Sequence, residues 1–522
     1  MDTVSHTQSN NTLSACLQRG QAAVNARNMA EAVVWFEKAV RENPKDAQAL
    51  ACYGQALCWA RQRGRGLDNL RKAGALLVKS GRKTGDSRQL LLLAEQLQYW
   101  HDYPASLALI KQAVQIKKDV RGFQLLAHTY ARLNDNSRAL AASQQALRGL
   151  PNDAVLNLQH AMLEAKAGLY GEAGARLTRV LQTAAGEEQA FRAHKELAKI
   201  YDKQRNYARV FEHLHAAAAL APLLPEVRKQ EAGFVYDLLA DYTAGFDAEL
   251  LRRWAGAEWL QQTRAPVFLI GFFRSGTTLA QEVLATHPDV FVSDETDLIV
   301  ALKDELNRMS ALKDNVTAQL RAAGPEAVRH LRDFYWQLVE QRYGDSAARR
   351  VFIDKTTMNT FDIGLINAVF PDAKVVFMLR DPRDICLSCY MQVMAPSVSS
   401  VHLFGWRSTA ELYAGTMRWW LHIQPLLSLD VMKFRYEDGI ADFQATFSRV
   451  FEFLALEWHA QAGEFYKQAG QKFIASPSFD QVSKPLYATS VGRWRHYAAE
   501  FDAVADLLAP YIETFGYSAD VE

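Results

Sequence analysis

Residues 267–278 constrain the fold of this chain more than any other segment does. They read Val-Phe-Leu-Ile-Gly-Phe-Phe-Arg-Ser-Gly-Thr-Thr. The apolar run 267–270 predicts a short buried strand that Gly271 ends, and the amphipathic run from Thr278 predicts a helix. A strand, a glycine-containing turn and a helix N-terminus gather backbone N–H groups and the positive end of a helix dipole around one point. This segment therefore predicts an anion-binding loop.

The loop differs from the phosphate loop of nucleoside triphosphatases at one decisive position. Gly271 and Gly276 have the G-x-x-x-x-G spacing of a Walker loop, but Thr277 stands where that loop needs lysine. The positive charge comes instead from Arg274, inside the turn. We expect a phosphate-like ligand other than ATP with magnesium, which disfavours a phosphate-transferring kinase.

Bulk composition predicts a soluble, multidomain protein. The chain has 522 residues, 49% of them hydrophobic and 22% charged, which is enough for two or three domains. A net charge of +1 gives no global attraction for nucleic acid or an anionic membrane. The polar start predicts no signal peptide or anchor, no apolar run is long enough for a membrane span, and five cysteines favour a reducing cytoplasm.

Small residues recur at fixed spacing in the first half of the chain. Separations of 12, 7 and 5 residues occur three times, in Gly20/Ala32/Ala39/Pro44, Ala127/Ala139/Ala146/Pro151 and Ala198/Val210/Ala217/Pro222. The pattern resembles the tetratricopeptide repeat, a pair of antiparallel helices that cross at small residues. After a polar tail at 1–12, six repeats over 13–224 predict an α-solenoid whose concave face binds a peptide or protein. The alternative is that the array only stabilises its neighbour or mediates self-association, such as a homodimer.

The pattern changes after a helical connector at residues 225–264. Five short β-rich runs then alternate with helical stretches, namely Val267–Ile270, Val290–Val292, Val351–Ile353, Lys374–Leu379 and Val431–Phe434. This alternation predicts an α/β domain over 265–522, with a central parallel sheet covered by helices on both faces.

A second candidate anion site follows the fourth of these strands. The strand ends in Arg380-Asp381-Pro382-Arg383-Asp384, and the next helix carries Ser388. Ligands of open α/β sheets bind at the carboxyl ends of strands, so Arg380 would lie beside the first loop if the two strands are neighbours. An arginine fork suits a phosphate. The alternative is a surface Arg/Asp cluster that caps a helix.

The two loops together resemble the sulfotransferase family, over about residues 265–517. The motifs that carry the resemblance are R-S-G-T-T at 274–278, H-P at 287–288, D-K-T at 354–356, R-D-P-R-D at 380–384 and R-Y-E-D at 435–438. The spacings from Arg274 to Glu295, from Lys355 to Arg380 and from Arg380 to Ser388 are similar to those of the tyrosylprotein sulfotransferase branch. Phe273 and Gln392 depart from it, because they replace a proline and a phosphate-binding arginine.

The resemblance implies a donor and a role for each matched residue. The donor would be 3′-phosphoadenylyl sulfate, the product adenosine 3′,5′-bisphosphate, and no metal would be needed. Ser275, Gly276, Thr277 and Thr278 would hold the 5′-phosphosulfate, with Arg274 at the transferring sulfuryl group. Arg380, Ser388 and Arg493 would hold phosphate, and Tyr436 the nucleotide. Glu295 would be the catalytic base, and Lys355 and Ser478 would stabilise the transition state.

Each of these residues also has an ordinary structural interpretation. Glu295 lies in Ser-Asp-Glu-Thr-Asp, which is typical of a helix N-terminus. Lys355 could be a surface lysine, Ser478 a loop residue, Tyr436 a core aromatic and Arg493 a solvated charge. We interpret His287 as a turn residue, and the Cys386/Cys389 pair as buried in a helix.

The chemistry is coherent without the resemblance. Sulfuryl transfer, by analogy with phosphoryl transfer, needs positioning, a cation at the leaving oxygen and a base for the acceptor hydroxyl. A phenol is the easiest common acceptor, with a pKa of about 10. We expect a cytoplasmic sulfotransferase that acts on a peptide or protein tyrosine. A small phenol, glycan or lipid acceptor and a repeat-based adaptor with an inactive second domain are the alternatives.

Overall fold

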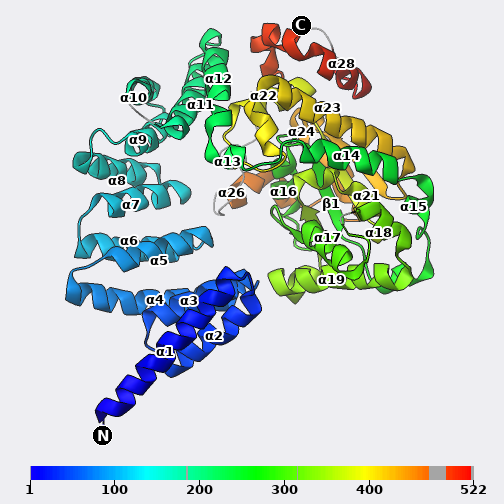
Figure 1. Ribbon diagram of the computed structural model, residues 1–522. Coiled ribbons are helices and arrows are strands. Elements are labelled where there is room, and N and C mark those ends of the chain that lie inside the picture. Colours follow the sequence, from blue (N-terminus) through cyan, green and yellow to red (C-terminus); the bar gives the residue numbers. More distant parts are fainter. Residues whose placement is uncertain (1, 184–185, 314, 470–488, 519–522) are drawn as a thin grey trace. The chain divides into compact units, whose positions relative to one another are not determined.

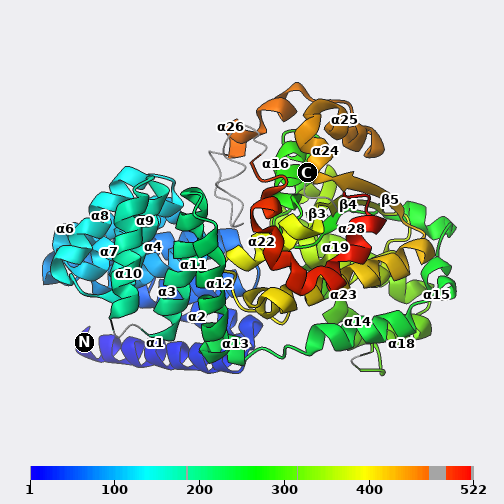
Figure 2. The same ribbon diagram turned by 90° about the horizontal axis from the view of Figure 1, so that it is seen from above.

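The computed structural model describes residues 2–183, 186–313, 315–469 and 489–518. Contacts divide the chain into two compact units, Met1–Gln189 and Ala190–Glu522. The first unit consists of helices, and the second is a mixed α/β domain (Figures 1 and 2). No helix in the described ranges is long and apolar enough to cross a bilayer.

The helices of the predicted repeats form successive pairs. Their bounds are α1 Asp2–Asn25, α2 Met29–Glu42, α3 Ala47–Trp59, α4 Arg63–Thr84, α5 Arg88–Tyr99, α6 Tyr103–Ile116, α7 Val120–Arg132, α8 Asn136–Gly149, α9 Ala154–Lys166, α10 Tyr170–Gln182, α11 Glu187–Lys203 and α12 Ala208–Leu220. Because α1 begins at Asp2, the segment expected as a polar tail continues the first repeat helix. The predicted α-solenoid is confirmed.

The turn inside every pair has the same backbone conformation. One residue with a positive φ ends the first helix of each pair, at Arg27, Arg61, His101, Asn134, Gly168 and Arg205. The predicted small positions lie where the helices cross: Ala32, Ala39, Ala139 and Ala146 are fully buried. A Cβ on Gly66 would lie 2.7 Å from the Gly54 carbonyl oxygen. The spacing found in the sequence is therefore the spacing of close helix crossings.

Contacts place the last repeat pair in the second unit. Val210, Phe211 and Leu214 of α12 belong to the same hydrophobic core as Phe268 of the sheet. The boundary drawn from the sequence between repeats and connector, at residue 224, stays a prediction about the repeat pattern. By contacts, the chain divides one helix pair earlier.

The second unit contains the five predicted strands in one parallel sheet. They are β1 Val267–Gly271, β2 Val290–Val292, β3 Val351–Lys355, β4 Lys374–Leu379 and β5 Asp430–Arg435, in the order β2-β3-β1-β4-β5. Strand β1 pairs with β3 through Val267↔Ile353 and with β4 through Gly271↔Met378. This register aligns the carboxyl ends of β1, β3 and β4, where the predicted site residues follow.

Helices cover the sheet of the second unit and connect its strands. The α-helices are α13 Pro225–Arg228, α14 Phe234–Gly245, α15 Ala248–Arg252, α16 Thr277–Leu284, α17 Leu298–Met309, α18 Val316–Ala322, α19 Pro325–Tyr343, α20 Asp345–Ala348, α21 Ile363–Val369, α22 Pro382–Met391, α23 Trp406–Ile423, α24 Tyr436–Ala441, α25 Phe443–Phe453, α26 Phe465–Ala469 and α28 Ala505–Thr514. The 3₁₀ helices are η1 Ala221–Leu223, η2 Glu258–Gln262, η3 Thr357–Thr360, η4 Ser400–Phe404, η5 Gln424–Leu426, η6 Ala460–Glu464 and η7 Arg493–Val504.

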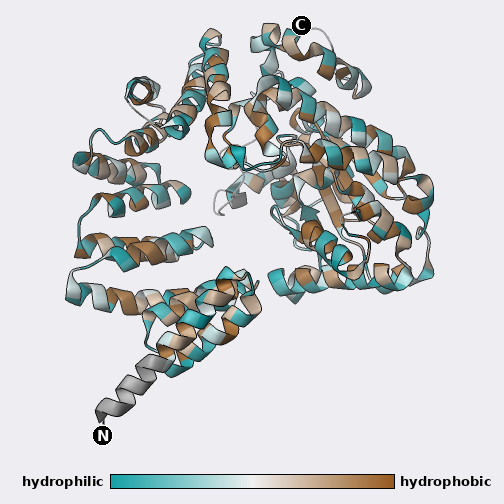
Figure 3. Cartoon of the chain, in the orientation of Figure 1, coloured by the Kyte–Doolittle hydropathy of each residue, from teal (hydrophilic) through white to brown (hydrophobic). Residues whose placement is uncertain are grey.

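Alternate residues of the strands enter two separate cores. Phe268 and Ile270 of β1 pack into the core that contains α21 and α23, whereas Leu269 packs with Leu279 of α16 on the opposite face. Strand β1 is correspondingly apolar throughout (Figure 3). The connector helix α14 contributes Leu239 to the first core. A sheet buried on both faces is the expected outcome for parallel strands.

Candidate active site

The segment between β1 and α16 forms a tight loop with two left-handed residues. Arg274 has a φ of 65° and Gly276 a φ of 103°. A Cβ on Gly276 would lie 2.5 Å from Cδ2 of Tyr436, so the ring leaves room only for glycine. Helix α16 begins at Thr277, directly after this turn. The loop therefore has the geometry expected of an anion-binding turn at a helix N-terminus.

Arg380 leaves the end of β4 and contacts this loop. Its Nη1 donates a hydrogen bond to the Arg274 carbonyl oxygen at 3.0 Å, and its guanidinium carbon lies 4.8 Å from the centre of the Tyr436 ring. Arg274 in turn donates from Nε to Ser388 Oγ at 3.0 Å. The structure thus brings together the two strand ends that the sequence predicts as neighbours.

Two buried polar atoms at these strand ends have no hydrogen-bond partner among the described residues. They are Ser275 Oγ and Arg380 Nε. Ser275 is fully buried, and Arg380 is 7% exposed. Buried polar groups without a partner are rare in folded proteins. A hydroxyl and a guanidinium N–H that point from adjacent loops without a protein acceptor fit an anionic ligand.

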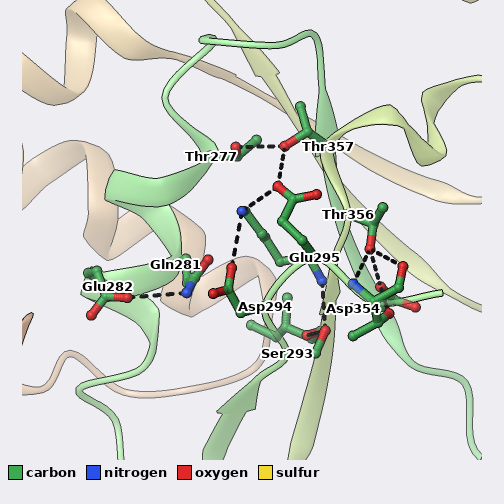
Figure 4. Close-up of polar contacts among 12 residues, drawn as sticks. Thr277, Gln281, Glu282, Ser293, Asp294, Glu295, Asp354, Thr356 and Thr357 are labelled. Atoms are coloured by element: carbon green, nitrogen blue, oxygen red, sulfur yellow. Dashed lines mark hydrogen bonds and ion pairs between the residues drawn. The ribbon is translucent and has the colours of Figure 1, made fainter. Parts of the chain in front are cut away.

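Lys355 and Glu295 form an ion pair at the end of β3 (Figure 4). Lys355 Nζ lies 2.6 Å from Glu295 Oε1 and 3.5 Å from Asp294 Oδ1. The lysine side chain is 1% exposed, and that of Glu295 is 48% exposed. The pair therefore has a buried cation and a carboxylate that solvent or a substrate can reach.

Two threonine hydroxyls connect this ion pair to the 271–278 loop. Thr357 Oγ1 donates to Glu295 Oε1 at 3.3 Å and lies 2.9 Å from Thr277 Oγ1, on the first residue of α16 (Figure 4). Thr277, the residue that replaces the Walker lysine, thus reaches the carboxylate through one other side chain. The predicted base, the predicted cation and the loop form one continuous polar cluster.

The backbone at Glu295 is strained rather than part of a helix cap. Its φ is 39°, and its N–H donates to the Lys355 carbonyl oxygen at 3.0 Å. The N-cap residue of α17 is Asp297, whose side chain makes no capping hydrogen bond. Left-handed backbone at a residue other than glycine is costly and collects at functional sites. The helix-cap interpretation of Glu295 does not describe this structure.

Asp354 lies in the D-K-T motif, but the sequence predicted no role for it. It precedes Lys355, is completely buried, and accepts hydrogen bonds from Tyr335 Oη at 2.9 Å and from Thr296 and Thr356 Oγ1, both at 3.3 Å. Burial raises the pKa of the Asp354 carboxyl to about 6, although these hydrogen bonds act in the opposite direction. A charged residue within an apolar strand was the available signal.

Asp384, in the R-D-P-R-D motif, is a second residue whose role was not predicted, and it holds the chain segment that contains Gly492 and Trp494. Its two carboxylate oxygens accept from the N–H groups of Gly492, at 2.7 Å, and Trp494, at 3.0 Å. Burial raises the pKa of Asp384. Its neighbours in the R-D-P-R-D motif are also structural: Asp381 caps α22 and pairs with Arg383 at 2.8 Å. The motif therefore consists of Arg380, which contacts the loop, followed by residues that hold the surrounding backbone.

The remaining predicted residues are less closely associated with the loop. Arg493 pairs with Asp202 of α11, with Nη2 to Oδ2 at 2.9 Å, so its role as a phosphate ligand stays a prediction. Ser478 lies outside the described residues. His287 Nδ1 accepts from the Asp289 N–H at 3.1 Å, as expected of a turn residue. Cys386 and Cys389 are buried and unpaired.

Comparison with known proteins agrees with this geometry. Residues 266–460 match the model of the sulfotransferase family, and residues 13–46 match a tetratricopeptide repeat. Residues 266–460 are thus similar in sequence to the sulfotransferase family. The match contains β1 to β5 and the cluster from Arg274 to Tyr436.

Three relatives show how far the similarity extends. An uncharacterized protein of Aquifex aeolicus is 25% identical over 60% of this chain and 40% of its own. Protein-tyrosine sulfotransferase A of Caenorhabditis elegans is 26% identical over 48% of this chain and 67% of its own. The protein-tyrosine sulfotransferase of Drosophila melanogaster is 25% identical over 48% of this chain and 51% of its own. The chain thus spans between two fifths and two thirds of these relatives' lengths.

Solved structures resemble each half of the chain. The sulfotransferase domain of a Synechococcus olefin synthase has 20% identity and a TM-score of 0.36, covering 49% of this chain and 96% of its own. The tetratricopeptide-repeat protein YrrB has 20% identity and a TM-score of 0.28, covering 36% and 92%.

Proposed function

We propose that this chain transfers a sulfuryl group from 3′-phosphoadenylyl sulfate to an acceptor hydroxyl. One observation carries the proposal. Arg380, the 271–278 loop and the Glu295–Lys355 pair form a single connected polar cluster at three adjacent strand ends. The sulfotransferase-family match over the same residues supports it.

The residues at the two strand ends fit a donor with two anionic ends. Ser275 Oγ and Arg380 Nε are buried and lack partners among the described residues, so both are suited to donate hydrogen bonds to phosphate oxygens. Arg380 donates hydrogen bonds to two backbone carbonyls, those of Arg274 and Ser490. Asp384 and Glu437 are within electrostatic reach of Arg380, but neither accepts one of these hydrogen bonds, so the guanidinium can still bind an anion.

Each charged group then has one task in the transfer. The bound donor supplies a sulfuryl group on a phosphate leaving group. Lys355 and Arg274 stabilise the negative charge that the bridging oxygen gains as its bond to sulfur breaks. Glu295 accepts the proton of the acceptor hydroxyl as the new oxygen–sulfur bond forms. Lys355 and Thr357 both bind Oε1 of Glu295, which leaves Oε2 for the acceptor.

We propose a peptide or protein tyrosine as the acceptor, because a phenol loses its proton most easily and two relatives are named protein-tyrosine sulfotransferases. The solenoid would recruit such a peptide, and the cytoplasm is the proposed compartment. Small phenols, glycans and lipids are the alternative acceptors. In the adaptor alternative, the second domain would bind no donor.

A transfer screen with radiolabelled donor tests the proposal. The full chain is incubated with tyrosine peptides, small phenols and glycans, and label in the acceptor is measured. We expect label in at least one hydroxyl class, and none with Glu295→Gln over the same period. Magnesium-dependent turnover of ATP, with no label transferred, would overturn the assignment in favour of a kinase.

A further inference from the structure

A short segment of the second unit, residues 490–497, touches the proposed donor site at one end. The Ser490 carbonyl oxygen accepts from Arg380 Nη2 at 2.6 Å. Ser490 Oγ lies 2.9 Å from Tyr436 Oη. Since Arg274 binds the other terminal nitrogen of Arg380 at 3.0 Å, two backbone carbonyls fix the plane of the guanidinium.

The middle of the 490–497 segment is fastened to α22. Asp384 accepts from the N–H groups of Gly492 and Trp494, and the Arg383 guanidinium lies 3.6 Å from the Trp494 ring centre. Gly492 has a φ of 68°, so the turn at this point depends on glycine.

The other end of the segment is fastened to the last repeat helices. Asp202 of α11 accepts from Tyr497 Oη at 2.6 Å and pairs with Arg493 at 2.9 Å. The Asp202 side chain is only 11% exposed. His496 stacks on Tyr207, with ring centres 4.3 Å apart and planes 6° from parallel.

Helix α11 also holds α22 directly. Lys195 is completely buried and donates from Nζ to the carbonyl oxygen of Tyr390, in the last turn of α22. Burial lowers the pKa of Lys195 to about 7, and its protonated form faces the negative end of the helix dipole, which is favourable. Helix α22 carries Ser388, which binds Arg274. Helix α11 thus contacts both the 490–497 segment, through Asp202, and α22, through Lys195.

We infer that Asp202 is a positioning residue for the donor pocket, and that α11 is part of the donor-binding machinery rather than only the end of a repeat array. Asp202 fixes Arg493 and Tyr497, these fix the 490–497 segment, and Ser490 then orients Arg380. Without the carboxylate, the half-buried Arg493 guanidinium and the Tyr497 phenol lose their charged acceptor together, and the segment shifts. This inference rests on the proposed function.

Calorimetry with adenosine 3′,5′-bisphosphate tests the inference on the full chain. Asp202→Asn should weaken binding about tenfold, and Asp202→Glu should restore most of it. The matched control is Glu196→Gln, which removes an ion pair with Lys199 of 2.8 Å on the same helix, at 12% exposure. The control should bind as the wild type does. In transfer assays, Asp202→Asn should raise the KM for the donor with little change in kcat.

The outcomes separate this inference from the proposed function. If the wild type does not bind the bisphosphate, the proposed function fails. If it binds and folded Asp202→Asn binds equally well, the inference is overturned. If Asp202→Asn does not fold, Tyr497→Phe decides, because it removes only the hydroxyl that reaches Asp202. A weakening of about threefold supports positioning, and unchanged binding overturns it.

Discussion

At the scale of single residues, the site contains two nearly buried cations with different kinds of partner. Arg380 is held by backbone carbonyls, whereas Lys355 is paired with the carboxylate of Glu295. A carbonyl orients a guanidinium without neutralising it, whereas Glu295 balances the charge of Lys355 until it takes up the acceptor proton. This difference assigns anion binding to Arg380 and local transition-state work to Lys355.

Replacing Arg380 tests its role in binding. Arg380→Ala should weaken binding of adenosine 3′,5′-bisphosphate by about 30-fold to 150-fold, since it removes charge-assisted hydrogen bonds worth about 2–3 kcal/mol. Arg380→Lys should recover only part, because a lysine has no fork. Isothermal titration calorimetry measures both. Arg349→Ala, at an arginine with 78% side-chain exposure, is the control, and equal weakening in it would refute a specific role.

Replacing Glu295 separates catalysis from binding. Glu295→Gln keeps the shape of the side chain but cannot accept the acceptor proton, so kcat should fall about 10²–10⁴-fold. Bisphosphate binding should stay within about twofold of the wild type, because Arg380 and the loop are untouched. Steady-state kinetics and calorimetry on the same preparation provide the test. A loss of affinity as large as the loss of turnover would mean that Glu295 is structural.

At the scale of elements, the sequence predicted all five strands and the approach of two strand ends. Short apolar runs bounded by glycine and proline indicate buried parallel strands, and they can be recognised in the sequence without tertiary information. The structural roles of Asp354 and Asp384 were not predicted, because their partners Tyr335 and Trp494 are distant in the chain. Hydrogen bonds between remote segments have no local pattern, so only the folded structure reveals them.

The 271–278 loop should not tolerate a side chain at Gly276. Gly276 has a φ of 103°, which is unfavourable for alanine, and the added Cβ would lie 2.5 Å from the Tyr436 ring. In Gly276→Ala, the loop or the ring must therefore move. Binding of the bisphosphate should weaken at least about tenfold. Gly174→Ala is a matched control, because nothing lies within 4 Å of its Cβ position in α10. Its binding should not change, and unchanged binding in both variants would contradict the loop assignment.

The buried carboxyl of Asp354 should make the stability of the fold depend on pH. The pKa of Asp354 is raised from 3.8 to about 6 in the folded chain. A raised carboxyl pKa means that the folded state binds the proton more tightly, so this contribution is full below pH 4 and is lost as the pH rises through 6. The Asp354 carboxyl thus contributes about 3 kcal/mol more to the free energy of unfolding at low pH than at neutral pH.

Asp354→Asn removes this titration. The unfolding free energy of the variant relative to the wild type should therefore rise by about 3 kcal/mol between pH 4 and pH 7.5. Urea denaturation of both proteins across this range is the measurement. Parallel pH profiles would show that Asp354 is already ionised in the fold at low pH.

At the scale of the whole molecule, repeat pattern and structural unit do not coincide. The sequence identifies α11 and α12 by the small residues of the last repeat, Ala198, Val210 and Ala217. Contacts place α12 and most of α11 in the second unit, where Val210, Phe211 and Leu214 share a core with the sheet. Helix spacing reveals which helices pair with each other, but not which core their outer faces enter.

Two fragments test this division. The fragment 190–522 should fold and bind the bisphosphate, whereas 225–522 should be destabilised by several kcal/mol, because it exposes the core surface that Phe211 and Leu214 cover. Thermal unfolding followed by circular dichroism compares the two. Equal melting temperatures and equal binding would instead place the functional boundary at residue 224.

The most direct test of the central claim is a calorimetric comparison of nucleotides on the unmodified chain. A pocket built from the 271–278 loop and Arg380 should bind adenosine 3′,5′-bisphosphate at least about a hundredfold more tightly than adenosine 5′-monophosphate, because only the former engages both strand ends. Equal affinities for the two nucleotides, or tighter binding of ATP with magnesium, would contradict a pocket made for a bisphosphorylated adenosine.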